Sequence, residues 1–314
     1  MQNLFIELNK IIENNQKFVV ISHNKPDGDT LGANLAISLY LKSIGKEVLS
    51  ACADKPSSNF KFLPEIQNLK QTFLLEEHDA IIIVDTGAKH LVKFFETYPE
   101  LNRTKKPLVC IDHHQSNSAF GTLQIIDPNE TSTTSLLLKI FDFLQWEITP
   151  NIATNLLNGI YTDTGSFKHG NTKAENFKSA SKLLKLGANL QQIAKYNFQT
   201  KSIAGLKLIG AALENLYISQ DQVATTAIPE YIQNQFPTEN DALSGLSDMI
   251  AGIKEAKYGV VYTERKGQIK ASLRTNKEFN VADIAAKYGG GGHIKAAGYK
   301  TEGKLQKVTL WQVV

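Results

Sequence analysis

The chain has 314 residues, and its 34 Lys and Arg against 31 Asp and Glu give a formal net charge of +3. Because compact cores stop growing near roughly 250 to 300 residues, this length predicts two domains. Hydrophobic residues at 42% and charged residues at 21% are typical of a globular protein, which excludes long disorder, collagen-like repeats and coiled coils.

The apolar residues alternate between short continuous runs and a helical period, which predicts an α/β fold. In chain order we expect a helix over 3–14, a strand over 18–22, a helix over 30–44, strands over 47–51, 80–84, 108–111 and 122–126, and helices over 131–145, 151–161 and 173–186. Near-continuous apolar strands are typical of a parallel sheet that is buried on both faces.

The remaining chain predicts a second, smaller α/β domain. We expect a helical linker over 189–216, strands over 217–228, 256–264 and 267–274, and a helix over 280–288. The domain boundaries that follow are 1–188, 189–216 for the linker, and 217–314. From Lys254 to Lys307 there are twelve Lys or Arg against five Asp or Glu, so the second domain is basic.

Segment composition also predicts the cellular setting. No stretch approaches the roughly 20 apolar residues that span a bilayer, and the first ten residues do not form a signal-peptide core. Cys52 and Cys110 are the only cysteines, which excludes a disulfide framework and a four-thiolate zinc site. We therefore expect a cytoplasmic protein without a membrane partner.

Acidic and imidazole side chains directly follow several predicted elements. His23 follows the first strand, Asp85 the third and Asp112 the fourth, while Asp163 follows the helix over 151–161. In open parallel sheets, ligands gather outside the carboxyl ends of the strands. These residues are therefore predicted to converge on one crevice.

The segment after the first predicted strand is unusually rich in ionisable residues. His23, Asp27 and Asp29 lie within seven residues, and Gly28 separates the two carboxylates. Carboxylates this close repel each other unless cations or solvent absorb their charge. These three residues alone would also fit a solvated turn that caps the following helix. Asp85 and the Asp112–His114 motif weigh against that simpler interpretation.

Asp112, His113 and His114 follow a buried strand, where adjacent imidazoles rarely serve a core. Mixed imidazole and carboxylate ligands suit Mn²⁺, Mg²⁺, Fe²⁺ or Zn²⁺, and the many oxygens favour Mn²⁺. Four carboxylates balance two divalent ions, which indicates a dinuclear site for displacement at phosphorus. They are Asp27, Asp29, Asp85 and Asp163.

Together these motifs resemble the DHH phosphoesterases, specifically the subfamily with a C-terminal DHHA1 domain, and the resemblance covers nearly the whole chain. Four motifs occur in order: SHNKPDGDTLG from Ser22, VDT from Val84, DHH from Asp112 and TDTG from Thr162. The resemblance implies an N-terminal parallel-sheet DHH domain and a smaller C-terminal α/β domain across a cleft.

The resemblance also implies the roles of individual residues. One Mn²⁺ would be held by His23, Asp27 and Asp85, and the other by Asp29, Asp85, His113 and Asp163. Mg²⁺ or Co²⁺ are alternative ions. His114 would contact the substrate phosphate or protonate the leaving oxygen, and Asp112 would fix a histidine tautomer.

The C-terminal part carries a glycine-rich marker, YGGGGHIKAAGY, from Tyr288 to Tyr299. A four-glycine run can be a flexible loop, but bare backbone N–H groups can also approach phosphate closely. The DHHA1 domain of the family shows the same marker after a Ser-x-Arg strand, and SLRT matches it here. The implied substrate-binding residues are Ser272, Arg274, Gly290, Gly291, Gly292 and His293.

Some residues differ from the family motifs, and others have two possible roles. Ala33 stands where Ser is common, and Lys168 with His169 stands where an arginine and an aromatic residue often follow. His169 would either contact a base or lie in a solvated loop. Ser132 and Thr133 could meet a phosphate, although an ordinary helix-capping role is favoured.

These features predict a metal-dependent phosphoesterase. The leading function is 3′-to-5′ hydrolysis of very short RNAs to mononucleotides, with phosphatase activity on 3′-phosphoadenosine 5′-phosphate (pAp). The alternative is a phosphodiesterase for cyclic or linear dinucleotides such as c-di-AMP and pApA, and a non-catalytic nucleotide-binding module is disfavoured because the ligand positions are intact. The expected partners are short single-stranded RNA or nucleotides and a second copy in a homodimer.

Overall fold

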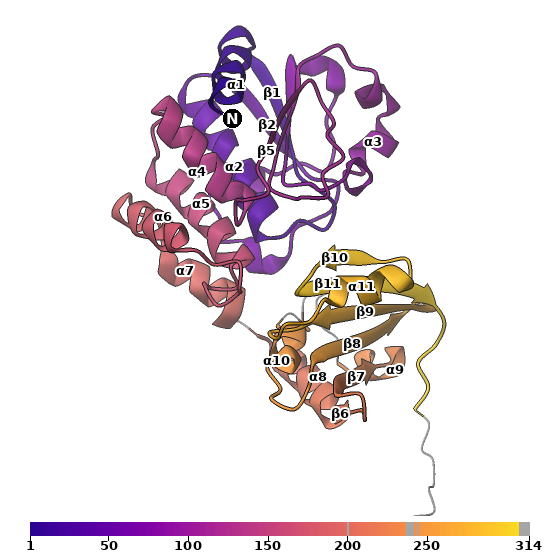
Figure 1. The fold of residues 1–314 in the computed structure, drawn as a ribbon. Helices are drawn as coiled ribbons and strands as arrows, with labels where there is room; N and C mark the ends of the chain where they lie inside the picture. The colour runs from indigo at the N-terminus through magenta and orange to yellow at the C-terminus, as the bar shows by residue number, and fades with distance from the viewer. Residues whose placement is uncertain (200, 237–241, 244, 308–314) are drawn as a thin grey trace, which may run out of the picture. The chain divides into compact units, whose positions relative to one another are not determined.

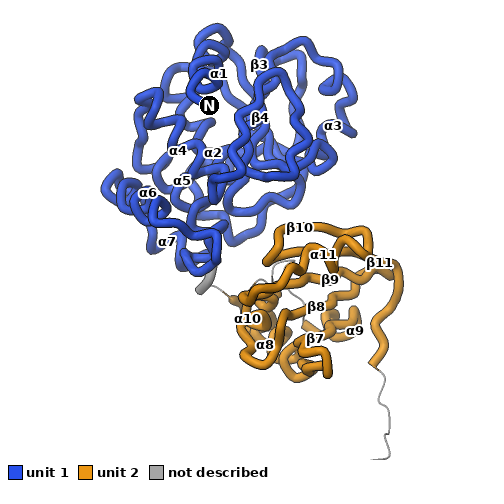
Figure 2. The backbone as a smooth tube through the Cα atoms, in the orientation of Figure 1, with its two compact units in different colours: residues 1–200 blue, residues 201–314 orange. Residues whose placement is uncertain are grey.

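The computed structural model describes residues 1–199, 201–236, 242–243 and 245–307. The chain divides into two compact units, residues 1–200 and residues 201–314 (Figure 2). The segment expected as a linker over 189–216 is divided between these units. The expected second domain over 217–314 includes residues 237–241, 244 and 308–314, which lie outside the described residues.

Unit 1 is built on a five-stranded, entirely parallel sheet with the order β2-β1-β3-β4-β5 (Figure 1). The strands are β1 (Lys17–Ile21), β2 (Glu47–Ala51), β3 (Ala80–Val84), β4 (Leu108–Asp112) and β5 (Leu123–Ile126). All residues of β3 and β4 are buried, as the continuous apolar runs predict. The parallel sheet expected from the sequence is confirmed.

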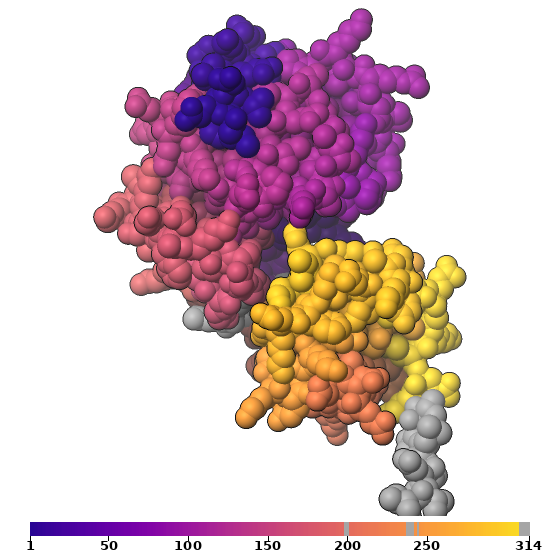
Figure 3. All heavy atoms as spheres, viewed as in Figure 1, coloured from indigo at the N-terminus to yellow at the C-terminus, as the bar shows by residue number. Residues whose placement is uncertain are grey.

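Helices cover both faces of this sheet. One face packs against α1 (Gln2–Asn14), α2 (Gly28–Ser43), α4 (Thr133–Leu144) and α5 (Pro150–Asp163), and the other packs against α3 (Phe94–Thr97) (Figure 1). Helix α1 forms part of the outer surface of the unit (Figure 3). The described part of unit 1 ends with α6 (Ala174–Lys185), α7 (Leu190–Ala194) and a π-helical turn (Lys195–Gln199).

Side-chain caps explain where the helices that frame the sheet begin. Asp27 accepts hydrogen bonds from the backbone N–H groups of Asp29 and Thr30 at the start of α2. Ser132 and Ser135 form a reciprocal capping box at α4, which confirms the capping role expected of Ser132. Short 3-10 turns fill the connections at Ser58–Phe60, Ile66–Asn68, Leu75–Glu77, Lys89–Leu91 and Pro99–Asn102.

Two glycines allow α2 and α5 to approach closely. A Cβ atom added to Gly32 would lie 2.4 Å from the carbonyl oxygen of Asn155, and one added to Gly159 would lie 2.3 Å from Asp29 Oδ1. Real Cβ atoms do not approach other atoms this closely. The helix crossing that brings Asp29 towards α5 therefore depends on the absence of side chains at both positions.

Unit 2 is a mixed six-stranded sheet with the order β10-β11-β9-β8-β7-β6, in which β7 and β8 are the parallel pair. Its strands are β6 (Tyr217–Ile218), β7 (Val223–Ile228), β8 (Tyr258–Arg265), β9 (Gln268–Arg274), β10 (Gly291–His293) and β11 (Ala296–Glu302). Helices α8 (Ile203–Glu214) and α10 (Leu246–Ala251) pack with one face, and α11 (Val281–Lys287) packs with the other. Helix α9 (Glu230–Gln233) follows β7.

One expectation for unit 2 is wrong in detail. The single strand expected over 217–228 is an antiparallel pair, β6 and β7, because the chain turns at Gln222, whose φ of 61° is left-handed. Within the glycine run, Gly291 and Gly292 form part of strand β10. Across the described residues, no helix combines the length and apolar character that a membrane span requires.

We predict that Gly32→Ala lowers the free energy of unfolding by about 1 to 3 kcal/mol, because the added methyl group meets backbone rather than a movable side chain. Chemical denaturation monitored by circular dichroism measures this change. Gly170→Ala is the matched control, because no atom lies within 4 Å of its added Cβ. Equal stability of the two variants would contradict the close helix crossing.

Candidate metal centre

The candidate site lies at the carboxyl edge of the unit 1 sheet. His23 follows β1, Asp85 follows β3, and Asp112 ends β4 with His113 directly after it. In the strand order of this sheet the connections diverge between β1 and β3, which is the position where open α/β sheets bind ligands. The fourth contributor is Asp163, the last residue of α5.

A first group of ligating atoms comes from His23, Asp27 and Asp85. His23 Nε2 lies 3.6 Å from Asp85 Oδ2 and 3.8 Å from Asp27 Oδ2. The other oxygen of Asp27 accepts the two capping hydrogen bonds of α2. Capping therefore holds this carboxylate in place and leaves Oδ2 towards the imidazole.

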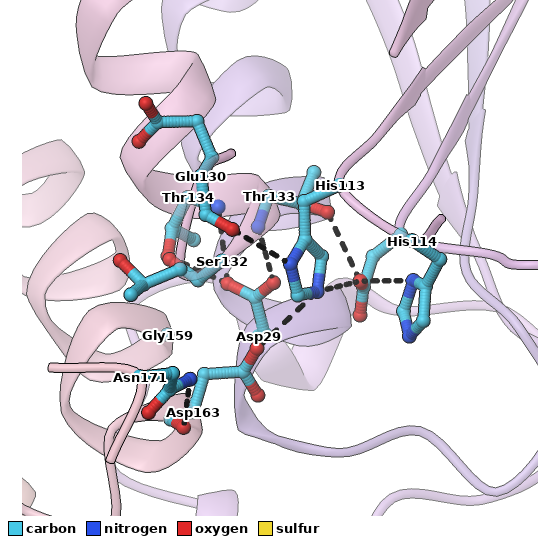
Figure 4. Close-up of polar contacts among 12 residues, drawn as sticks. Asp29, His113, His114, Glu130, Ser132, Thr133, Thr134, Gly159, Asp163 and Asn171 are labelled. Carbon is cyan, nitrogen blue, oxygen red and sulfur yellow. Dashed lines mark hydrogen bonds and ion pairs between the residues drawn. The ribbon is translucent and has the colours of Figure 1, made fainter. Parts of the chain in front are cut away.

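A second group comes from Asp29, His113 and Asp163, whose ligating atoms lie within 4.8 Å of one another (Figure 4). His113 Nε2 lies 3.3 Å from Asp163 Oδ2 and 3.6 Å from Asp85 Oδ1. Asp85 thus presents one oxygen to each group. Its backbone has a left-handed φ of 56°, a conformation that few non-glycine residues adopt and that is enriched at functional sites.

Asp29 is fully buried and is held by the start of α4 (Figure 4). Its Oδ2 accepts a hydrogen bond from the Thr133 N–H at 2.6 Å, and its Oδ1 accepts from the N–H and the hydroxyl of Thr134 at 3.0 and 2.6 Å. Thr133 also donates its hydroxyl to Asp85 at 3.0 Å. A helix N-terminus favours negative charge, so α4 fixes the Asp29 carboxylate beside the cluster.

Backbone carbonyls orient the two histidines that face the carboxylates. His23 Nδ1 lies 2.7 Å from the Asn24 carbonyl oxygen, and His113 Nδ1 lies 3.3 Å from the Glu130 carbonyl oxygen. When Nδ1 is protonated it donates a hydrogen bond to the carbonyl oxygen, and Nε2 is then the ligating atom. Both rings therefore offer Nε2 to the cluster.

His114 is held in a different way. Its Nδ1 lies 2.7 Å from Asp112 Oδ1, the contact that the sequence predicts for Asp112. The Asp112 carboxylate also accepts from the His113 backbone N–H at 2.8 Å and from Asn117 Nδ2 at 2.6 Å. Because Asp112 is fully buried and bonded on both oxygens, it fixes the orientation of the His114 ring.

The carboxylates of the cluster disturb one another's ionisation. Burial, reinforced by the charge of Asp85, raises the pKa of Asp29, and burial together with the charge of Asp29 raises the pKa of Asp163. Burial alone would also raise the pKa of Asp85, but the neighbouring His23, with the other imidazoles, lowers it below its usual range. The cluster thus holds more negative charge than its surroundings neutralise.

The pKa values of the histidines also reflect the excess of carboxylates. Burial disfavours the charged ring of His23, but the hydrogen bond to Asp85 and the charges of both carboxylates outweigh it and raise its pKa to about 10. In the same way, Asp112 overcomes the burial of His114 and raises its pKa to about 9. Asp163 adds a carboxylate at a helix C-terminus, where anions are disfavoured. The clusters fit a metal site, because cations supply the positive charge that the residues lack.

The sequence did not single out Thr134, Glu130 and Gly159, which contact Asp29 or His113. Thr133, for which a capping role was favoured, instead donates hydrogen bonds to the carboxylates of Asp29 and Asp85. The segment from Glu130 to Thr134 could have indicated this role, since it places several hydroxyl groups at the start of one helix. Because such a segment is also typical of an ordinary helix cap, its contacts with distant carboxylates were not predicted.

The residues expected to bind substrate lie in unit 2. Ser272 and Arg274 are two residues apart on β9 and therefore point to the same face of the sheet. Arg274 Nε lies 3.3 Å from Asp248 Oδ1 of α10, and its Nη1 donates to the Leu273 carbonyl oxygen at 3.1 Å. A guanidinium has five N–H donors, so donors remain for an anion.

Local structure accounts for most of the glycine run. Gly289 ends α11 with a left-handed φ of 71°. A Cβ on Gly290 would lie 2.2 Å from the Gly298 carbonyl oxygen, and one on Gly292 would lie 2.5 Å from the Ala296 carbonyl oxygen. By contrast, nothing lies within 4 Å of a Cβ on Gly291.

Packing therefore explains Gly290 and Gly292 and leaves Gly291 as the position where a bare backbone meets open space. His293 is the exposed last residue of β10, directly after the strand glycines Gly291 and Gly292.

The residues after Asp163 form an unusual turn. Gly165, Ser166 and Phe167 all have left-handed φ angles, of 54°, 57° and 63°. The exposed His169 folds back so that its ring occupies the space that a Gly165 side chain would need, and its Nδ1 lies 3.4 Å from the Asp163 carbonyl oxygen. His169 thus contacts the backbone of a candidate ligand rather than lying in an open loop.

The fold and the cluster define a class of phosphoesterase. Residues 17–160 match the model of the DHH family, N-terminal domain, and residues 220–311 match the DHHA1 domain. The chain is also 31% identical over 288 residues to a bifunctional oligoribonuclease and PAP phosphatase from Thermus thermophilus, which covers 90% of this chain and 84% of that protein. The chain therefore belongs to the DHH/DHHA1 phosphoesterases, which are metal-dependent hydrolases.

Two further similarities bear on its function. The chain is 24% identical over 317 residues to a cyclic-di-AMP phosphodiesterase from Bacillus subtilis, covering 94% of this chain and 46% of that protein. The crystal structure of an exopolyphosphatase-related protein from Bacteroides fragilis matches with a TM-score of 0.90 at 25% identity, covering 97% of this chain and 93% of that one.

We predict that Mn²⁺ raises the unfolding temperature of unit 1, and more so at pH 8 than at pH 6. The raised pKa of His23 stabilises the metal-free fold at low pH, and this contribution is lost as the pH rises towards 10. Metal binding needs the neutral ring, so it strengthens in the same direction.

At a free concentration of 100 times its dissociation constant, a bound ion raises the free energy of unfolding by about 2.7 kcal/mol. Differential scanning calorimetry with and without Mn²⁺ measures the shift, which Asp85→Asn should largely remove and the exposed Asp221→Asn should preserve. A shift that is the same in both variants would exclude Asp85 as a ligand.

Proposed function

We propose that this protein hydrolyses short oligoribonucleotides from the 3′ end to mononucleotides and removes the 3′-phosphate of pAp. The observation that carries the proposal is the similarity to the Thermus thermophilus enzyme, whose name states both activities and which matches over 90% of this chain. The two family models match residues 17–160 and 220–311, which lie in unit 1 and unit 2. The cytoplasmic location expected from the cysteine content stays a prediction.

The two activities require the same bond to break. In an RNA cleaved from its 3′ end, and in pAp, the phosphorus atom separates from the 3′-oxygen of a nucleoside. The substrates differ only in whether the phosphorus also carries a second nucleoside. One site that binds the phosphoryl oxygens and protonates a 3′-oxygen can therefore serve both reactions.

The proposed cofactors are two divalent ions, with Mn²⁺ favoured by the mixed nitrogen and oxygen donors and Mg²⁺ or Co²⁺ as alternatives. The first ion would be held by His23, Asp27 and Asp85, and the second by Asp29, Asp85, His113 and Asp163. Such ions supply positive charge to the phosphoryl oxygens and lower the pKa of the attacking water.

His114 is proposed to act on the substrate rather than on an ion. Its Nδ1 is committed to the buried Asp112, which holds the ring and stabilises its charged form. A protonated ring beside the cluster can contact the phosphate or pass a proton to the departing 3′-oxygen. Asp112 acts through this ring and through its bond to the His113 backbone.

Unit 2 is proposed to bind the phosphates or sugars of the substrate. Arg274 retains donors for a phosphate, Ser272 offers a hydroxyl on the same face of β9, and Gly291 exposes backbone to open space. Gly290, Gly292 and His293 complete the proposed set. The metal cluster lies on unit 1 and this set on unit 2.

The alternative is hydrolysis of cyclic or linear dinucleotides, supported by the similarity to the cyclic-di-AMP phosphodiesterase. That similarity covers less than half of the relative, whereas the oligoribonuclease is matched over most of its length. A non-catalytic nucleotide-binding module is disfavoured, because all the expected ligands are present: His23, Asp27, Asp29, Asp85, His113 and Asp163.

We predict that pAp and RNAs of two to five nucleotides are turned over faster than a 24-mer or c-di-AMP, and that 5′-end-labelled RNA shortens one nucleotide at a time. Gel electrophoresis of the labelled RNA and chromatography of the nucleotides measure both results. Faster turnover of c-di-AMP than of pAp and the trimer would favour the alternative. Internal cleavage products would exclude exonuclease action.

We further predict that Arg274→Ala lowers kcat/KM roughly 10- to 100-fold, because a charge-assisted contact with phosphate contributes about 1.5 to 3 kcal/mol. Metal content should not change, since Arg274 lies in unit 2. Arg265→Ala, at the end of β8, is the matched control and should retain activity. Unchanged kcat/KM for Arg274→Ala on both pAp and a trinucleotide would exclude it from the substrate site.

A further inference from the structure

The turn of α2 that carries two candidate ligands is bonded to α5. Gly28 lies between Asp27 and Asp29, and its carbonyl oxygen accepts a hydrogen bond from Nδ2 of Asn158, a residue of α5, at 2.9 Å. Gly28 is the first residue of α2, so the same carbonyl already accepts the backbone N–H four residues later in the helix. The bond from Asn158 is therefore additional to those of the helix, and it fixes the peptide between the two carboxylates.

Asn158 also connects this turn with the end of unit 1. Its side chain is fully buried, and its Oδ1 accepts a hydrogen bond from Asn197 Nδ2 at 2.9 Å. Asn197 lies in the π-helical turn Lys195–Gln199, just before unit 1 ends at residue 200. Turns of this kind are rare and are frequent at functional sites. One buried amide thus joins Gly28 to the segment of the chain that leads to unit 2.

The hydrogen bonds fix the orientation of both amides. Asn197 Nδ2 also donates to the Ile193 carbonyl oxygen at 2.9 Å, and a carbonyl can only accept. Asn197 therefore presents Nδ2 to Asn158, which must answer with Oδ1. The remaining group of Asn158, Nδ2, then points to Gly28. Rotating either amide would place two donors or two acceptors together, so the three segments have one bonded arrangement.

We propose that Asn158 and Asn197 are positioning residues that couple the metal centre to the end of unit 1. When Asp27 and Asp29 hold ions, the Gly28 peptide between them is fixed, and Asn158 then favours the bonded arrangement of the π-helical turn. Because coupling between two sites is reciprocal, an ordered turn strengthens metal binding by the same factor. The inference rests on the proposed metal centre and is independent of the proposed substrate.

A buried asparagine can also serve stability alone. In that case its loss would weaken the fold, but the metal affinity of the folded protein would not depend on the π-helical turn. This turn has a second anchor, because the ring of Tyr196 stacks on that of Phe62 with 5.1 Å between the ring centroids. The turn can therefore stay in place when the asparagine link is removed, which separates the two interpretations.

Titration of the metal-free, full-length protein with Mn²⁺ tests the effect of the link on metal binding. Electron paramagnetic resonance of the unbound ion measures the affinity. Asn158→Leu removes both hydrogen bonds with little change in volume. It should raise the Mn²⁺ dissociation constant about 10- to 100-fold, the usual effect of losing a group that orients a metal ligand. Asn197→Ala keeps the bond to Gly28 and should raise the dissociation constant less.

Hydrogen exchange followed by mass spectrometry tests the reciprocal effect. In the wild type, saturating Mn²⁺ should slow exchange of the backbone amides over residues 193–197 by about fivefold or more, the range of typical coupling between sites. In Asn158→Leu and Asn197→Ala this protection should be lost, even at Mn²⁺ concentrations that saturate each variant.

Asn15→Ala is the matched control. Asn15 Nδ2 donates to the carbonyl oxygen of Ile11 at the end of α1, which is the same bond to the fourth preceding residue that Asn197 makes. This variant should match the wild type in both measurements. Circular dichroism checks that each variant is folded, and the partly buried Asn197 provides the test if Asn158→Leu does not fold.

Unchanged Mn²⁺ affinity in both variants, or protection of residues 193–197 that persists in them, would overturn the coupling and leave the metal centre intact. So would a wild type in which Mn²⁺ does not change the exchange of this segment. A wild type that binds no Mn²⁺ would overturn the metal centre and this inference together.

Discussion

The buried carboxylate of Asp29 is the interaction on which the candidate site depends. It lies at the junction of three helices: it belongs to α2, it accepts hydrogen bonds from the first turn of α4, and it contacts α5 where Gly159 has no side chain. A buried charge is costly unless it is bonded and compensated. The helix N-terminus supplies the bonds, and cations in the adjacent cluster would supply the remaining charge.

Much of the fold was predictable because buried parallel strands have a clear sequence signal. The runs that became β3 and β4 are continuously apolar, and the polar residue after each run marks the carboxyl edge of the sheet. Unit 2 was less predictable, since strands such as β7 and β9 are not continuously buried and so lack a continuous apolar run. The turn at Gln222 divides one apparent strand into two, and strand β10 is hidden in glycines that no strand pattern would indicate.

The candidate site was predictable for side chains whose chemistry is rare in a core, such as His113 and Asp85. It was not predictable for the residues that hold them, because Thr133 and Thr134 resemble common helix starts. Their contacts join segments about a hundred residues apart, and no local pattern records them. Gly159 was missed for the same reason, since its role depends on the path of α2.

Anomalous X-ray diffraction from crystals grown with Mn²⁺, collected at the manganese edge, shows whether unit 1 binds two ions. We expect two peaks in unit 1. One should lie among His23, Asp27 and Asp85, and the other among Asp29, His113 and Asp163, with Asp85 next to both. A single peak, or peaks away from these carboxylates, would contradict a two-metal centre built on the Asp29 junction.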